Sequence, residues 1–128
     1  MCGDEVGTVS WLSASLKKIG ELRELRAGWD SYNAQPIQER AIQEGSDLLM
    51  YLARLDLPEP RIVPTSAGGI QLEFQKDERE LELEILPDGS IEFLTVEMQE
   101  GTVLAITSSR MFELANWLCT GLDGRHYR

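Results

Sequence analysis

The residues with the clearest chemical potential are four glutamates in the middle third of the chain. Glu73, Glu82, Glu84 and Glu92 each stand between two apolar residues. Alternation with a period of two places one set of side chains in a core and the other set in water. Carboxylates attract arginine and lysine side chains and also hard cations. The pattern therefore predicts a strand surface that can recognise positive charge.

The turns between these strands predict how the glutamates pair. A turn centred on Asp77 and Glu78 places Glu73 opposite Glu82. A three-residue turn over 87–89, with Gly89 in the left-handed conformation, keeps apolar residues together, whereas a two-residue turn would mix core and solvent positions. The three-residue turn places Glu84 opposite Glu92. We call Glu73, Glu82, Glu84 and Glu92 the acidic patch. Directly paired Cβ atoms lie about 4.5–5.5 Å apart, so like charges there destabilise the sheet unless a cation offsets them.

The charge balance limits the partners that this chain suits. There are 22 acidic and 12 basic residues, a formal net charge of −10. Residues 61–106 hold ten of the acids and three of the bases, which leaves twelve and nine for the rest. Such a surface opposes direct binding to nucleic acid or to an anionic membrane. It permits a basic protein partner, a cation, or mimicry of nucleic acid.

Four interpretations of the acidic patch are open from the sequence. It can be a solvated surface that only keeps the protein soluble, a docking surface for a basic protein, a nucleic-acid mimic, or a divalent-cation site. A flat sheet offers no enclosing loop, and no aspartate-rich calcium motif is present, so we expect no metal site. A carboxylate-based cation-binding domain or metal-dependent enzyme remains the alternative function.

Residues suited to catalysis are scarce. His126 is the single histidine and lies three residues from the end of the chain, where segments are usually poorly ordered. Cys119 stands beside Trp117 and Leu118 and suits a buried position. The run "SAGG" over 66–69 lacks the lysine and helix of a phosphate-binding loop. We therefore expect no catalytic residue, no cofactor and no enzymatic activity.

Two features indicate a reducing, cytoplasmic location. Cys2 and Cys119 do not form a metal-ligand or disulfide framework. The first residues carry no signal-peptide pattern, and no apolar run approaches the ~20 residues of a membrane span. We expect a cytoplasmic protein that does not associate with membranes.

A second candidate site is the run "GWDSYNAQPI" over 28–37. It can be a structural joint, in which Trp29 covers two helices and the side chains of Asp30 and Asn33 fix a turn. It can also be a protein-binding loop, since exposed Trp29 and Tyr32 would be typical interface anchors. The composition favours the joint and leaves the binding loop open.

These candidate sites need a scaffold of helices and strands. Apolar residues spaced by three and four predict a helix over 9–25, capped by Thr8 or Ser10, and a second helix over 37–55 with Pro36 in its first turn. Alternation predicts strands around 70–75, 80–85 and 91–95, with a possible fourth over 101–106, and a closing helix over 107–122. The sequence thus predicts one α+β domain, residues 1–128, with an antiparallel meander of three to four strands and the helices on one face.

Three segments resemble a widespread family of small uncharacterised bacterial proteins. They are "GWDSYNAQPI", "PEPRIVPTSAGGIQLEF" and "ELELEI"; the family carries W-D-x-Y-x-A-x-P-I and P-T-x-x-G-G-I-x-L-E motifs. The resemblance covers about residues 20 to 86, and Phe74 stands where the family has Trp. It implies no catalytic residues, because the family has no established activity. Its members look like accessory proteins of mobile elements and defence loci.

These observations together predict a protein-interaction module. We expect the acidic patch, with Trp29 and Tyr32, to bind and inhibit or escort a basic protein, as an antitoxin, immunity protein or phage anti-defence factor would. A structural subunit that forms a homodimer through its helices is a further alternative.

Overall fold

The computed structural model describes residues 11–55, 57–97, 100–105 and 118. Several predicted features lie outside these residues: Cys2, Thr8, Ser10, Cys119, His126 and, apart from Leu118, the closing helix. Leu118 itself is fully buried, and its carbonyl oxygen accepts a hydrogen bond of 2.9 Å from Arg79 Nε.

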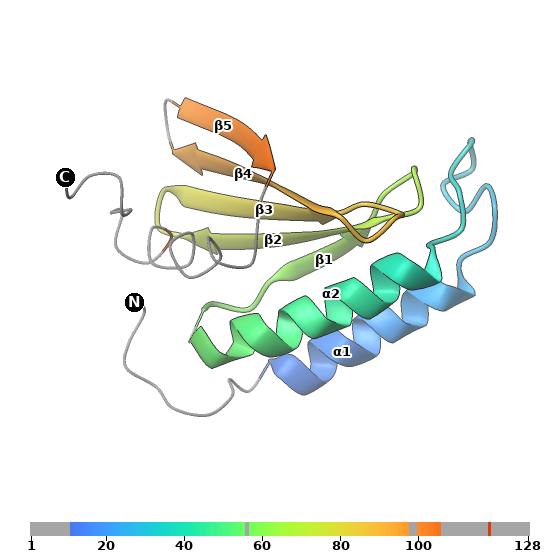
Figure 1. The fold of residues 1–128 in the computed structure, drawn as a ribbon, viewed down its shortest axis with the longest axis horizontal. Helices are drawn as coiled ribbons and strands as arrows, with labels where there is room; N and C mark the ends of the chain where they lie inside the picture. The colour runs from blue at the N-terminus through green and yellow to red at the C-terminus, as the bar shows by residue number, and fades with distance from the viewer. Residues whose placement is uncertain (1–10, 56, 98–99, 106–117, 119–128) are drawn as a thin grey trace.

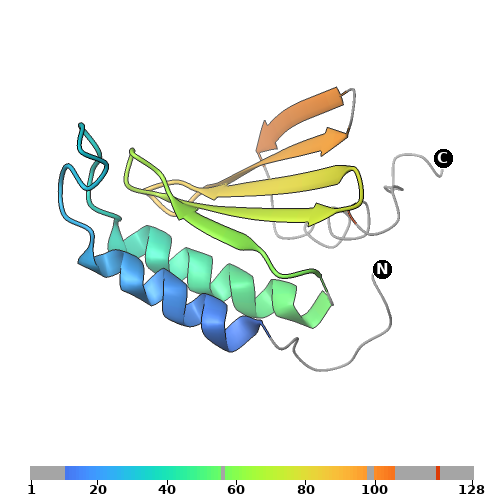
Figure 2. The same ribbon diagram turned by 180° about the vertical axis from the view of Figure 1, so that it is seen from behind.

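The described part of the chain has an α+β architecture. Five antiparallel strands form one sheet in the order of the sequence: β1 (Arg61–Pro64), β2 (Ile70–Lys76), β3 (Arg79–Ile85), β4 (Ile91–Glu97) and β5 (Glu100–Ala105). Two helices, α1 (Leu12–Glu21) and α2 (Glu39–Leu52), lie side by side on one side of the sheet (Figures 1 and 2). Each continues into a short 3-10 turn, η1 (Leu22–Glu24) and η2 (Ala53–Leu55). No helix in the described ranges is long and apolar enough to cross a membrane.

The predicted strand count was too low because β1 was not predicted. This strand has four residues, stands between prolines, and ends at Pro64, so it is too short to show a period of two. It pairs antiparallel with β2, with Arg61 opposite Glu73 and Pro64 opposite Ile70. Proline is tolerated there because β1 is the edge of the sheet.

Both predicted hairpin registers are confirmed. Lys76 pairs with Arg79 at the end of the first hairpin. In the second, Ile85 pairs with Ile91, and Gly89 has the expected positive φ of 91°. The turn is closed by a hydrogen bond of 2.7 Å from the Leu86 N–H to the Ser90 carbonyl. Turn length and the apolar face therefore specify the same register.

The core lies between the sheet and the helices. Six side chains of β2 and β3 point to this inner face and are fully buried: Ile70, Leu72, Phe74, Leu81, Leu83 and Ile85. Each contributes about 1.5–3 kcal/mol by leaving water. Trp11 joins this core, since its indole N–H donates to the Leu57 carbonyl at 2.9 Å and its ring meets the edge of Phe74. Helix α1 begins after Trp11, which makes no side-chain capping bond.

Helix α2 begins at Glu39, later than the predicted start at Pro36. The backbone before it is held by a distant turn instead. The Gln35 N–H donates to the Ser66 carbonyl at 2.8 Å, and the Gln38 N–H donates to the Gly68 carbonyl at 2.9 Å. These bonds keep Gln38 extended at ψ 141°, and the helix starts only after it.

Candidate functional site

The sheet surface turned away from α1 and α2, which we call the outer face, carries the candidate site. The strand pairing places three rungs of side chains on it. In order across β1 to β4, the rungs are Val63, Gln71, Glu84 and Glu92; Arg61, Glu73, Glu82 and Leu94; and, on β2 to β4, Gln75, Glu80 and Val96.

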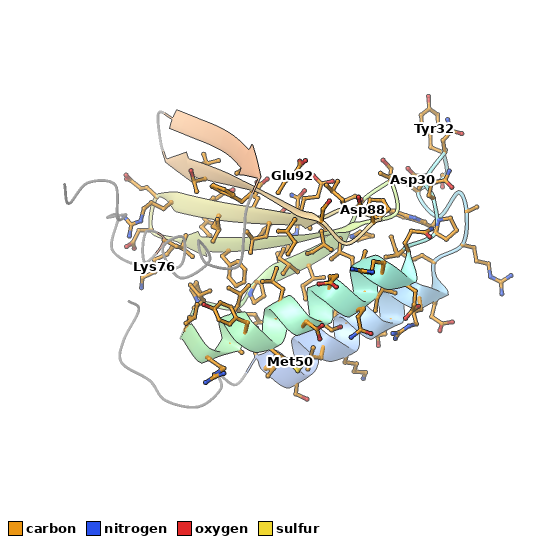
Figure 3. All side chains as sticks on the ribbon, viewed as in Figure 1. Asp30, Tyr32, Met50, Lys76, Asp88 and Glu92 are labelled. Carbon is orange, nitrogen blue, oxygen red and sulfur yellow. The ribbon has the colours of Figure 1, made fainter. Side chains whose placement is uncertain are left out.

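The structure brings the four predicted glutamates together. Glu73 is paired directly with Glu82, and Glu84 is paired directly with Glu92. Glu92 is exposed, while the other three are half-buried. Figure 3 shows Glu92 on the side of the sheet away from the helices, whereas Met50 of α2 projects from the opposite side. The acidic patch is thus a continuous surface across β2, β3 and β4.

Little positive charge offsets the acidic patch. Among the described residues, its one ion pair joins Arg61 Nη1 to Glu73 Oε1 at 3.5 Å. The Arg61 side chain is 75% exposed, and ion pairs this exposed contribute little stability. Gln71 Nε2 donates to Glu73 Oε2 at 2.7 Å and lies 3.4 Å from Glu82 Oε1, which bridges the two carboxylates. The remaining negative charge is open to a partner.

Glu82 lies among other negatively charged residues of the outer face. Burial of its carboxyl group raises the pKa of Glu82, and the negative charges of Glu73 and Glu80 raise that pKa further. A raised carboxyl pKa means that the folded protein holds this charge at a cost. A cation docked over the patch would relieve that cost.

The sequence prediction missed several residues of the outer face. Glu80 follows the same alternation as Glu82 but faces Gln75 rather than another acid, so it was left out of the patch. Arg61 was missed because β1 was missed. The apolar pair Leu94 and Val96 interrupts the glutamates on β4, opposite Glu82 and Glu80; the signal for it was the unbroken run "FLTV".

Two shallow hollows shape the outer face. One, of about 150 Å³, is lined by Gln71, Glu82, Glu84, Glu92, Phe93 and Leu94. The other, of about 270 Å³, is lined by Glu59, Arg61, Glu73, Phe74, Gln75 and Glu80. Both hollows expose carboxylates beside apolar surface, a lining that suits long side chains with an apolar stem and a cationic end. Within the described residues, no group of three histidine, cysteine or acidic side chains could hold a metal ion.

The two predicted anchors of the loop over 28–37, Trp29 and Tyr32, have different environments. Trp29 is half-buried against the core, and its indole N–H donates to the Gln35 carbonyl at 2.8 Å. Asp30 Oδ1 accepts from the N–H groups of Tyr32 and Ala34, at 2.9 and 3.2 Å. Tyr32 is 82% exposed and projects away from both helices (Figure 3). Trp29 therefore acts as a joint, and Tyr32 is the residue that the loop displays.

Two of the three segments that carry the family resemblance meet in space. The 28–37 loop rests on the turn over 65–69 through the bonds from Gln35 and Gln38. A Cβ on Gly68 would lie 2.9 Å from the Pro36 carbonyl oxygen, and Gly68 has a φ of 99°, so glycine is required there. The "W-D-x-Y" and "G-G-I" motifs thus lie in two segments that pack against each other.

Comparison of the chain with protein-family models, with curated proteins and with solved structures gives no match. The resemblance to the bacterial family stays a prediction.

Proposed function

We propose that this protein is a non-enzymatic interaction module that binds a basic protein through the outer face of its sheet. The observation that carries the proposal is the acidic patch: four glutamates adjoin across three strands, and within the described residues one exposed arginine pairs with them. A basic partner would supply the missing positive charge. Complementary charge of this kind speeds association and selects the partner.

Binding would occlude the basic surface of the partner. The outer face offers carboxylates on β2 and β3 and apolar side chains on β4, Leu94 and Val96, so a partner with cationic and apolar residues in neighbouring rows fits it best. By covering that surface, the protein would inhibit or escort a partner that binds nucleic acid or is toxic. An antitoxin, an immunity protein or a phage anti-defence factor of the cytoplasm would work in this way.

Affinity capture from the native host tests the proposal. The bait is the full chain, alongside the variant Glu82→Gln/Glu84→Gln and the control Glu21→Gln/Glu24→Gln. The control removes the same charge from exposed positions of α1 and η1, in the helix layer on the other side of the sheet. Captured proteins are identified by mass spectrometry and titrated by calorimetry.

We expect a protein rich in lysine and arginine that binds the wild type and the control equally. Its affinity for the acidic-patch variant should fall about tenfold or more, because truncating one partner of a charge pair buried at an interface costs about 2–5 kcal/mol. Equal affinity for all three baits would refute docking through the outer face.

A further inference from the structure

The loop that carries Tyr32 is fixed by hydrogen bonds within the loop and by hydrogen bonds to the turn over 65–69. Within the loop, the Gly28 N–H donates to the Ala34 carbonyl at 2.7 Å, and the Ser31 N–H donates to the Gly28 carbonyl at 2.8 Å. Ser31 has a φ of 67°, a conformation that costs a non-glycine residue about 1 kcal/mol or more. Outside the loop, Gln35 and Gln38 bind the 65–69 turn. The tip is therefore preorganised.

The apolar neighbours of Tyr32 in the loop pack into the fold, whereas the side chain of Tyr32 projects into solvent. Ala34 and Ile37 are buried in the fold, and Trp29 packs against the core. Tyr32 is the most exposed large hydrophobic side chain among the described residues, at 82%. Folding alone gives no reason for an aromatic ring there. A ring on a preorganised loop binds a partner at a low entropic cost, since little motion is lost.

The surroundings of Tyr32 indicate a cationic partner group. Asp30 and Asp88 lie at the same end of the molecule as Tyr32 (Figure 3). Lys76 lies at the opposite end, whereas Arg40 lies within reach of Asp88, whose pKa is lowered by hydrogen bonds from Ser90 and by the charge of Arg40. A tyrosine ring attracts a guanidinium through its π face, and arginine stacks on aromatic rings better than lysine does. The carboxylate of Asp30, which accepts the Tyr32 N–H at 2.9 Å, strengthens this preference for positive charge.

We infer that Tyr32 is a second docking element, which stacks on an arginine of the same basic partner while the acidic patch holds other cationic groups. This inference rests on the proposed function for the chemistry of the partner. Stacking on Tyr32 makes the protein prefer arginine to lysine. The carboxylates of the acidic patch cannot stack on a guanidinium in this way.

Two synthetic peptides of equal length and charge, (Gly-Arg)5 and (Gly-Lys)5, test the inference. Their affinities for the full chain are measured at low ionic strength by NMR titration, and the ratio of the two is compared among variants. Tyr32→Ala removes the ring, and Tyr32→Phe keeps it. Tyr51→Ala is the matched control, because Tyr51 is an exposed tyrosine of α2 in the helix layer.

We expect the wild type, Tyr32→Phe and Tyr51→Ala to prefer the arginine peptide alike. Tyr32→Ala should reduce that preference about two- to fivefold, as expected for one exposed cation–π contact, with the smaller loss of affinity for the lysine peptide. An unaltered preference in Tyr32→Ala would overturn the inference.

The acidic patch gives a different result in the same experiment. Glu82→Gln/Glu84→Gln should weaken both peptides together. If this variant weakens both and Tyr32→Ala changes nothing, the tyrosine inference fails and the proposed function stands. If only Tyr32→Ala has an effect, the acidic patch fails and the tyrosine anchor stands. The melting temperature of each variant shows that it is folded.

Discussion

At the scale of single residues, the structure shows why Glu82 is the most sensitive member of the outer face. It faces Glu73 across the strand pair, and Glu80 adds negative charge from the same strand. Its carboxyl group is half-buried, so water screens this repulsion incompletely. Glu73 by contrast has the cationic side chain of Arg61 within reach. Removing the charge of Glu82 therefore removes an unfavourable interaction.

Glu82→Gln should stabilise the protein at neutral pH by up to about 1 kcal/mol, the size of a like-charge pair across strands. The pKa of Glu82 is raised in the folded state, so the folded protein binds more protons than the unfolded chain in the window above the ordinary value of 4.5. The stability of the wild type then falls as pH rises through that window. The gain of the variant should be present at pH 7 and vanish below about pH 4.

Urea unfolding of both proteins at several pH values measures this effect. Glu21→Gln is the control, since it removes one exposed charge of α1. A Glu82→Gln variant that is less stable than the wild type at pH 7 would show that the charge is compensated.

Gly69 gives a second prediction at the residue scale. A Cβ there would lie 2.3 Å from the carbonyl oxygen of Ile85, a distance that real contacts do not reach. Gly69→Ala should cost about 1–3 kcal/mol, because backbone atoms must move apart. Gly20→Ala in α1 is the control, since its nearest neighbour lies at 3.6 Å; it should stabilise the helix by about 0.5–1 kcal/mol. Equal stability of the two variants would contradict this close approach.

At the scale of elements, the strands that form the acidic patch were the most predictable part of the fold. Their alternation and their turn residues are local signals, and both point to one register. The start of α2 was not predictable in the same way. It depends on one hydrogen bond from Gln35 to Ser66 and one from Gln38 to Gly68, which join residues 31 and 30 positions apart in the sequence. No local pattern around Pro36 reports such a contact.

The candidate site shows the same division between local and distant signals. The acidic patch follows from alternation and could be predicted. Arg61 could not, because a four-residue strand between prolines carries no period. The sequence also could not show that Trp29 packs against the core while Tyr32 is exposed. Both are aromatic residues of one loop, and only the fold decides which of them packs.

Asp30 tests whether the 28–37 loop is held as the structure indicates. Asp30→Ala removes the acceptor for the N–H groups of Tyr32 and Ala34, and should cost about 1 kcal/mol. Hydrogen exchange at these two amides should become faster, with little change in the sheet. Asp30→Asn keeps an oxygen acceptor and should stay near the wild type. Unchanged exchange in Asp30→Ala would mean that the loop is fixed by other contacts.

At the scale of the whole molecule, the fold gives the sheet two faces of different composition. The inner face of the sheet packs on α1 and α2 and forms the core, and the outer face gathers carboxylates that the core does not need. Attraction between this face and a basic partner should act over about 10 Å at 0.1 M salt and weaken as salt rises. In the proposed complex, Tyr32 would add a contact that salt affects less.

The most direct measurement is a map of where a cation binds. The (Gly-Lys)5 peptide is added to the isotopically labelled full chain, and amide chemical shifts are followed at low and at high salt. We predict that the largest shifts fall on β2, β3 and β4, around Glu73, Glu82 and Glu92, and that they diminish at high salt. Shifts spread equally over the acidic residues of α1 and α2 would contradict the claim that the outer face is the docking surface.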